Sequence, residues 1–214
     1  MKLDWIKAGF TFGVLHNMKF ETPRLLTDIE AYVKKNFANA DTSKLLYHNY
    51  THTQNVVEHT KEIADHYSLG QETEFVLLAA AWFHDTGHLF NEWEGHEEKS
   101  VEVAEFFLSD KGLTDQMLKE IRRCIMATKM PAHPTDLMEA IICDADTYHL
   151  GTDLFFQHNE LVWDEIEARL GKKIVNRVAK TVLFMEAHKF FTSYCRELLQ
   201  AKKEKNLEKL RSVL

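Results

Sequence analysis

The sequence contains little proline and little glycine. Only 3 prolines and 8 glycines occur among 214 residues, and segments that alternate apolar with polar residues are hard to find. These scarcities argue against a β-rich fold and favour helices joined by short loops. We therefore expect an all-α fold. The length fits one rather large domain, so the expectation is a single helical bundle that spans residues 1–214.

Cysteine and long hydrophobic runs are also scarce. Cys124, Cys143 and Cys195 are too few and too widely spaced for a disulfide framework or a CxxC zinc site, so buried thiols are expected. The longest apolar run, residues 75–83, is far shorter than the roughly 20 residues that span a bilayer. Residues 1–7 lack the apolar core of a signal peptide. The sequence therefore predicts a cytoplasmic protein with no membrane partner.

Positive charge is in deficit. The chain carries 26 lysines and arginines against 33 acidic residues, which gives a formal net charge of -7. Broad binding of nucleic acid depends on Lys and Arg meeting phosphate, so this balance argues against it. An anionic substrate would need local positive charge, and a bound cation could supply it. The sequence does not indicate an oligomeric state.

The scarce glycines and prolines divide the chain into expected helices. These lie at about 22–37, 51–67, 72–84, 96–108, 114–128, 135–149 and 153–170. The remaining segment, 173–214, is too long for one typical helix and is expected to break once. Segment 72–84 is the most hydrophobic, so it should be the central buried helix.

The central helix is expected to end in the doublet His84-Asp85. An unpaired carboxylate at the edge of a core is costly, and a divalent metal ion would satisfy both side chains. Gly87 would permit the chain to distort just beyond the doublet. Taken alone, however, His84-Asp85 is better explained as a capped helix end with a hydrogen-bonded carboxylate. The neighbouring motifs are needed to distinguish a metal site from a capped helix end.

Further polar residues stand at the ends of other predicted helices. Upstream, His48 and His52 are four residues apart, a spacing that can place both on one side of a helix. Downstream, Asp144 and Asp146 end another apolar segment.

The order His52, His84-Asp85, Asp146 resembles the signature of the HD superfamily of metal-dependent phosphohydrolases. That signature is a histidine, a later His-Asp doublet and a distant aspartate on a helical bundle. The resemblance covers about residues 47–150, with the helices of 153–214 packing on this core. It implies an HD-type bundle and one divalent ion (Mn, Mg, Fe, Ni, Co or Zn) held by His52, His84, Asp85 and Asp146. Open positions on such an ion would accept water and a phosphate oxygen. The expected activity is hydrolysis of a phosphate ester or anhydride of a small metabolite, such as a nucleotide.

Two local motifs strengthen the resemblance. Residues 47–52, Tyr-His-Asn-x-x-His, match a motif of the cyclic-nucleotide phosphodiesterases of the same superfamily. By this match His48 is a candidate proton donor to the leaving oxygen, while Asp85 could orient the attacking water or accept its proton. The pair Ala145-Asp146 matches the closing Ala-Asp motif, so Asp146 is preferred to Asp144 as the fourth ligand.

A second metal is less well supported. His96 opens a segment that resembles one whose histidine binds a second metal in some relatives, but Thr128 stands where those relatives supply a further histidine. We therefore expect one tightly held ion, with His88, His96, Thr128 and Lys129 near the substrate phosphate or a weak second ion. A structural role for His88 and His96 fits equally well.

Two other functions are compatible with the same residues. A di-iron oxygenase similar to the inositol oxygenases would need a second metal with additional histidine ligands. A non-catalytic, ligand-sensing module would keep the metal for structure alone.

Several aromatic residues follow Asp146 in the sequence. They are more simply explained as core than as a platform for stacking bases, although helices in this region could roof a pocket. The set is Phe155, Phe156, Trp163, Phe184, Phe190 and Phe191. The histidines outside the motifs are expected to be packing or surface residues, namely His59, His66, His149, His158 and His188.

Overall fold

The structure is a computed structural model that describes residues 22–90 and 94–214. The expectation for residues 1–7 therefore lies outside the described residues. Within the two described ranges, the secondary structure is helical and contains no strand, which confirms the all-α fold class.

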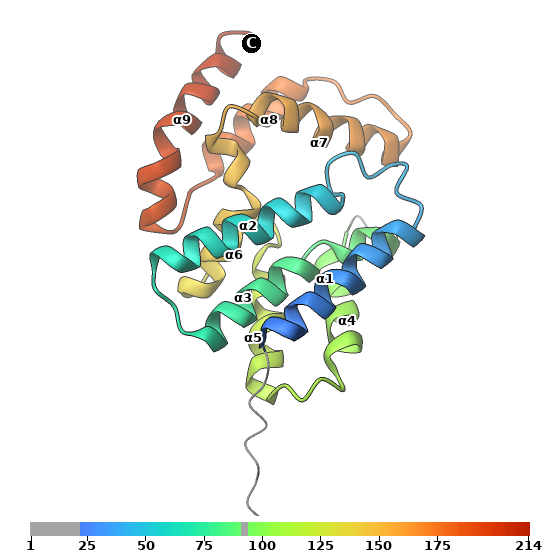
Figure 1. Cartoon of the computed structure of the whole chain (residues 1–214). Coiled ribbons are helices and arrows are strands. Elements are labelled where there is room, and N and C mark those ends of the chain that lie inside the picture. Colours follow the sequence, from blue (N-terminus) through green and yellow to red (C-terminus); the bar gives the residue numbers. More distant parts are fainter. Residues whose placement is uncertain (1–21, 91–93) are drawn as a thin grey trace, which may run out of the picture.

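The helices follow one another along the chain with short connections (Figure 1). They are α1 (Thr22–Asn39), α2 (Tyr50–His66), α3 (Gln71–Phe83), the 3-10 helix η1 (Thr86–Phe90), α4 (His96–Leu108), α5 (Asp115–Ala127), α6 (Leu137–Asp146), the 3-10 helix η2 (Tyr148–Gly151), α7 (Phe155–Leu170), α8 (Arg177–Ala187) and α9 (Ser193–Arg211).

The predicted helices are confirmed to within a few residues, with one difference that matters for the site. The helix predicted over 135–149 ends at Asp146, and the chain continues as η2. The predicted break in 173–214 separates α8 from α9 at residues 188–192. A helix end at Asp146 turns this carboxylate toward the site instead of burying it within a longer helix.

Helix α3 is the centre of the fold. Every residue from Phe75 to Phe83 is buried, and α3 contacts α1, α2, α4, α5 and α6. A helix that is apolar on all sides needs such partners around it. The end of α3 consequently lies inside the protein, where polar residues must find partners.

Helices α7, α8 and α9 lie together at one end of the molecule, beyond α2 and α6 (Figure 1). Helix α9 packs on η2, and Gly151 permits the close approach, since a Cβ there would lie 2.5 Å from Cβ of Leu199. Helix α7 contacts η2. The described helices are all too short or too polar to cross a bilayer. The three cysteines are buried free thiols, as predicted.

Candidate metal centre

His52 is positioned by the start of α2. The side chain of Asn49 caps this helix and accepts hydrogen bonds from the backbone N–H groups of Thr51 at 3.0 Å and of His52 at 3.1 Å. Asparagine is a preferred N-cap because its side-chain oxygen satisfies these otherwise unpaired donors. The asparagine of the 47–52 motif therefore fixes where α2 begins, and this places His52 in its first turn.

His84 and Asp85 follow the last residue of α3 and are both buried. Nδ1 of His84 lies 2.8 Å from the carbonyl oxygen of Ala81. A carbonyl only accepts, so Nδ1 carries a proton, and Nε2 is the nitrogen that would bind a metal ion. That Nε2 atom lies 3.2 Å from Oδ2 of Asp85. The end of α3 thus places two atoms that can bind a metal, Nε2 of His84 and Oδ2 of Asp85, next to each other.

Gly87 has a role that differs from the prediction. Its backbone is not in the left-handed region, so glycine is not required here for its conformational freedom. A Cβ at this position would instead lie 2.0 Å from the backbone oxygen of His96. Its N–H donates to Oγ of Ser100 at 2.8 Å. Glycine allows η1 to pack directly on the start of α4, which brings His88 and His96 together.

Asp146 completes the group from the end of α6. Its Oδ1 atom lies 3.1 Å from Nε2 of His52 and 3.6 Å from Nε2 of His84. Nε2 of His52 lies 3.3 Å from Oδ2 of Asp85. The structure therefore brings together all four predicted ligands, which come from three helices far apart in the sequence.

Asp144 has a different environment. Its carboxylate accepts hydrogen bonds from the backbone N–H groups of Phe191 and Thr192, each at 2.8 Å, and from the hydroxyl of Thr192 at 2.6 Å. Thr192 is the N-cap of α9. Asp144 thus anchors α9 to α6, while Asp146 faces the two histidines.

The ligand atoms of His52, His84 and Asp85 lie within 4.8 Å of one another and fit a divalent ion, and Asp146 lies beside the two histidines. With metal–ligand bonds of about 2.1 Å, neighbouring ligand atoms lie about 3.0 Å apart in octahedral and about 3.4 Å apart in tetrahedral coordination. The measured separations between imidazole nitrogens and carboxylate oxygens run from 3.1 to 3.6 Å. Nε2 of His84 and Oδ2 of Asp85 are buried without a hydrogen-bond partner among the described residues. A cation between these atoms would satisfy both.

The electrostatics of the group also favour a cation. Burial by itself would lower the pKa of His84, but the adjacent carboxylates of Asp85 and Asp146 raise it well above its usual range. Burial would raise the pKa of Asp85, but the neighbouring histidines His84 and His52 hold it well below its usual range. Two carboxylates in a buried site thus demand positive charge, which a divalent ion supplies.

His48 is held by a residue of α7. Its Nδ1 lies 2.8 Å from Oε1 of Glu165, whose Oε2 accepts the backbone N–H groups of Tyr47 and His48 at 2.9 Å each. Burial would raise the pKa of Glu165, but the hydrogen bond and charge of His48, followed by these backbone bonds, lower it to about 2. Glu165 is therefore an ionised carboxylate that fixes the orientation of the His48 ring.

The expected substrate-contacting residues line one cavity, and each has contacts of its own. The rings of His88 and His96 stack at 3.9 Å, and Nε2 of His96 lies 3.7 Å from Oδ1 of Asp85. Thr128 donates its hydroxyl to the carbonyl of Ile125 at 2.8 Å. Lys129 forms an ion pair with Glu98. All four residues line the same cavity as Asp85 and Asp146, and their contact with a substrate phosphate stays a prediction.

A second group of ligand atoms comes from His48, Asp85 and His88, within 4.8 Å of one another. Nη1 of Arg169 lies 3.0 Å from Nδ1 of His88. Guanidinium groups only donate, so Nδ1 accepts. Burial, followed by the charge of His48, lowers the pKa of His88 to about 3, so this ring is neutral near pH 7 and its proton is on Nε2. A protonated Nε2 offers no lone pair, which disfavours a second ion here.

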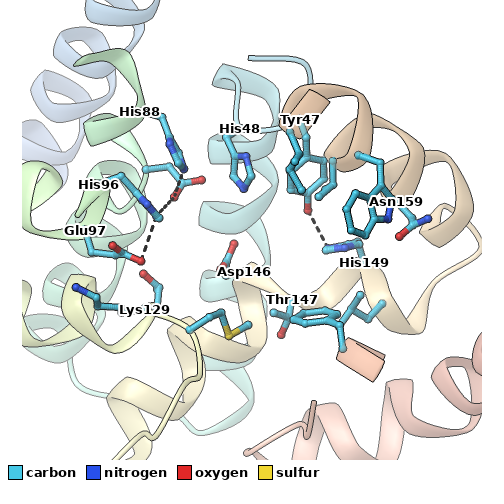
Figure 2. A pocket seen from close by; sticks show the side chains of 18 of the residues that line it. Tyr47, His48, His88, His96, Glu97, Lys129, Asp146, Thr147, His149 and Asn159 are labelled. Carbon is cyan, nitrogen blue, oxygen red and sulfur yellow. Dashed lines mark hydrogen bonds and ion pairs between the residues drawn. The ribbon is translucent and has the colours of Figure 1, made fainter. Parts of the chain in front are cut away.

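A cavity of about 730 Å³ opens beside the candidate metal centre. Figure 2 shows His88, His96, Glu97 and Lys129 on one side of it, Tyr47, His149 and Asn159 on the other, and Asp146 between them. The side chain of Asp146 is 23% exposed and so remains accessible from this space. The volume lies within the range of about 300–1,000 Å³ that is typical of small-molecule sites.

Some residues of the site could not be found from the sequence. Glu165 and Arg169 lie on α7, outside the motifs, and their spacing of four residues suggests only a surface ion pair. The structure instead buries Glu165 completely. His149, expected to be a packing or surface residue, lines the cavity and shares a hydrogen bond of 2.9 Å with the hydroxyl of Tyr47.

The other histidines lie outside the candidate ligand group. His59 stacks on Tyr148 at 3.7 Å, and His66 packs against Tyr194 at 4.6 Å. His188 lies 3.0 Å from the hydroxyl of Thr147, and His158 packs edge-on against Tyr47 at 5.7 Å. These contacts agree with the expected packing roles.

Comparison with known proteins gives an independent assignment. Residues 49–151 match the family model of the HD domain, and no curated protein matches the chain in sequence. Among solved structures, the chain resembles the crystal structure of a predicted HD superfamily hydrolase from an uncultured Thermotogales bacterium. The TM-score is 0.59, and the match covers 88% of this chain and 90% of that chain. At 20% identity this likeness shows a shared fold. Residues 49–151, which contain all four candidate ligands, are therefore the part of the chain that matches the HD domain.

Proposed function

We propose that this protein is a metal-dependent phosphohydrolase that cleaves a phosphate ester or anhydride of a small metabolite, such as a nucleotide. The observation that carries the proposal is the convergence of two imidazoles and two carboxylates, 3.1 to 3.6 Å apart, at the wall of a cavity of about 730 Å³. The similar structure, described as a predicted HD superfamily hydrolase, agrees with it.

The chemistry requires a cation at this point. His52, His84, Asp85 and Asp146 would hold a divalent ion, which when bound lowers the pKa of a coordinated water and neutralises phosphoryl charge. Without a cation, the carboxylates that line the cavity would repel a phosphate. Lining residues with negative charge are Asp85, Glu94, Glu97 and Asp146, whereas Lys129 and Lys180 supply positive charge.

In the proposed reaction, two residues of the chain would transfer protons. Asp85 turns Oδ2 toward His52 and His84 and Oδ1 toward His96, so Oδ1 is available to orient a water. His48 donates from Nδ1 to Glu165, and its side chain lines the cavity in which the leaving oxygen would lie. The ionised Glu165 fixes the orientation of this ring, as a general acid needs.

The oxidative alternative is less compatible with these contacts. A di-iron oxygenase would use a second ion, and the hydrogen bond from Arg169 keeps the proton of His88 on the nitrogen that such an ion would need. A sensing module would bind the metal without turnover, and only an activity assay separates it from the enzyme.

The test is phosphate release by purified protein on a panel of nucleotides and sugar phosphates, with Mn²⁺, Mg²⁺, Fe²⁺, Ni²⁺, Co²⁺ and Zn²⁺ added separately. We expect phosphate release with at least one of these ions, and no phosphate release from Asp85→Ala. The matched control is Asp110→Ala, because Asp110 has a side chain 76% exposed and pairs only with Lys111. A panel that stays silent with every ion would refute the proposal, and two irons per chain with oxygen uptake would replace it with the oxidative function.

A further inference from the structure

The cavity has a second half that phosphate hydrolysis does not require. Where the lining comes from η2, α7 and α8, it is largely apolar. These lining residues are Leu150, Phe155, Val162, Trp163, Ile166 and Phe184. A wall of this kind binds the uncharged, apolar part of a ligand, while a few polar groups fix its orientation.

One polar group in this wall is held by a chain of hydrogen bonds. The indole N–H of Trp163 lies 2.8 Å from Oγ1 of Thr181, and since an indole only donates, Thr181 accepts. The hydroxyl of Thr181 then donates to Oδ1 of Asn159 at 2.9 Å, with the carbonyl of Arg177 also within reach at 3.1 Å. The chain runs from Trp163 through Thr181 to Asn159 and fixes the orientation of the Asn159 amide.

This orientation determines what Asn159 offers to a ligand. Its Oδ1 receives the Thr181 hydrogen, and its Nδ2 makes no hydrogen bond to any residue in the described part of the chain. Asn159 lines the cavity and is half-buried. Figure 2 shows it across the cavity from His96, with Asp146 between them. The amide therefore presents two N–H donors beside an aromatic wall, which suits a flat ring that carries carbonyl or ring-nitrogen acceptors.

The charges of the cavity limit how many phosphates such a ligand carries. Among the described lining residues only Lys129 and Lys180 are cationic, and Lys129 already pairs with Glu98. The lining from residues 22–90 and 94–214 offers no cluster of arginines or lysines for a triphosphate, whose charge would need several. With so few positive charges, this lining suits a ligand with one phosphate, bound at the candidate metal centre.

We propose that Asn159, Thr181 and Trp163 form a binding subsite for the heterocyclic base of a nucleoside monophosphate, whose phosphate reaches the metal centre. The inference rests on the proposed function for the placement of the phosphate, but the base subsite is testable without hydrolysis. Asn159 is a specificity residue in it, and Thr181 acts through Asn159 as a positioning residue.

The test is binding of adenosine, guanosine, cytidine and uridine to the full chain, measured by isothermal titration calorimetry. Nucleosides carry no phosphate, so binding does not depend on turnover. At least one of them binds the wild-type protein, and Asn159→Asp, which replaces two donors by an acceptor, weakens that binding about tenfold. The control Gln157→Glu adds the same charge at an exposed position of α7 and leaves the affinity unchanged.

Thr181 supplies a second comparison. Thr181→Ser keeps the hydroxyl and retains affinity, whereas Thr181→Val removes it, frees the amide to turn and weakens discrimination among the four nucleosides. The inference is overturned when no nucleoside binds, or when Asn159→Asp and wild type bind equally well.

The outcome separates the subsite from the proposed function. Glycerol 2-phosphate has no base, so its metal-dependent hydrolysis by the wild-type protein reports on the metal centre alone. Hydrolysis of this compound without nucleoside binding refutes the subsite and leaves the phosphohydrolase. Nucleoside binding without phosphate release from any compound supports the subsite and refutes the phosphohydrolase.

Discussion

Glu165 and His48 are 117 positions apart in the chain, yet Oε1 of Glu165 lies 2.8 Å from Nδ1 of His48. The same carboxylate accepts two backbone N–H groups at the start of the motif. Glu165 thus positions both the ring of His48 and the backbone that carries it. This contact makes the C-terminal helices part of the site, although the motifs lie before them.

We predict that Glu165→Gln lowers kcat by about 10- to 100-fold and changes KM little, as loss of an orienting carboxylate behind a functional histidine does. The amide cannot stabilise a protonated His48 as a carboxylate does. The measurement is steady-state phosphate release, with kcat and KM determined separately.

Glu160→Gln is the matched control for this variant. Glu160 is on the same helix, has a side chain 67% exposed and pairs with Arg177 at 3.4 Å. Its kinetics should equal those of the wild type. Equal kcat values for Glu165→Gln and Glu160→Gln would show that Glu165 does not act through His48.

The same carboxylate predicts an acid-dependent stability. The pKa of Glu165 falls from 4.5 to about 2 in the folded protein. Its charged form therefore stabilises the fold fully above pH 4.5, and this contribution is lost as the pH falls toward 2. The effect is about 3 kcal/mol.

Urea unfolding of wild type and Glu165→Gln across this interval measures that contribution. The gap in unfolding free energy between the two proteins should be widest above pH 4.5 and should narrow as the pH falls. A gap that stays constant with pH would rule out ionised Glu165 as its source.

Asp144 and Asp146 should have separable roles. Asp144→Ala leaves the N–H groups of Phe191 and Thr192 without their partner and should destabilise the fold by about 3 kcal/mol while the metal is retained. Asp146→Ala should weaken metal binding more than about 100-fold with a smaller change in stability. Thermal melts and the metal content of both variants test these two roles. Metal loss confined to Asp144→Ala would show that Asp144, and not Asp146, is the metal ligand.

Gly87 should tolerate no side chain. In Gly87→Ala the new Cβ meets a backbone oxygen of His96, which cannot rotate away, so we expect a loss of about 3 kcal/mol in unfolding free energy. Gly70→Ala is the control, because a Cβ there would have nothing within 4 Å. Thermal unfolding of both variants tests the contact, and similar melting temperatures would show that η1 can move away from α4.

The sequence was sufficient for the fold class and for the grouping of the candidate ligands. Scarce glycine and proline, with one strongly apolar segment, predicted helices around α3, and the motifs named His52, His84, Asp85 and Asp146. The choice of Asp146 over Asp144 came from a short motif alone. The structure gives each a distinct environment, since Asp144 is surrounded by donors from the start of α9.

The rest of the site depends on contacts that no local pattern encodes. Glu165 and Asn159 lie on an amphipathic helix whose polar residues look solvent-facing until α7 is placed against η2. The reason for Gly87 was mispredicted because glycine is usually explained by its backbone freedom, whereas here the space is taken by the backbone of His96. Such features require the packing of distant elements.

The most direct test of the metal-dependent phosphohydrolase is an add-back titration. Protein stripped by a chelator is titrated with the most active ion while phosphate release is measured. We predict no phosphate release from the stripped protein, recovery that saturates near one ion per chain, and no recovery in Asp85→Ala. Release that survives removal of the metal, or a stripped protein that binds no divalent ion at His52, His84, Asp85 and Asp146, would contradict it.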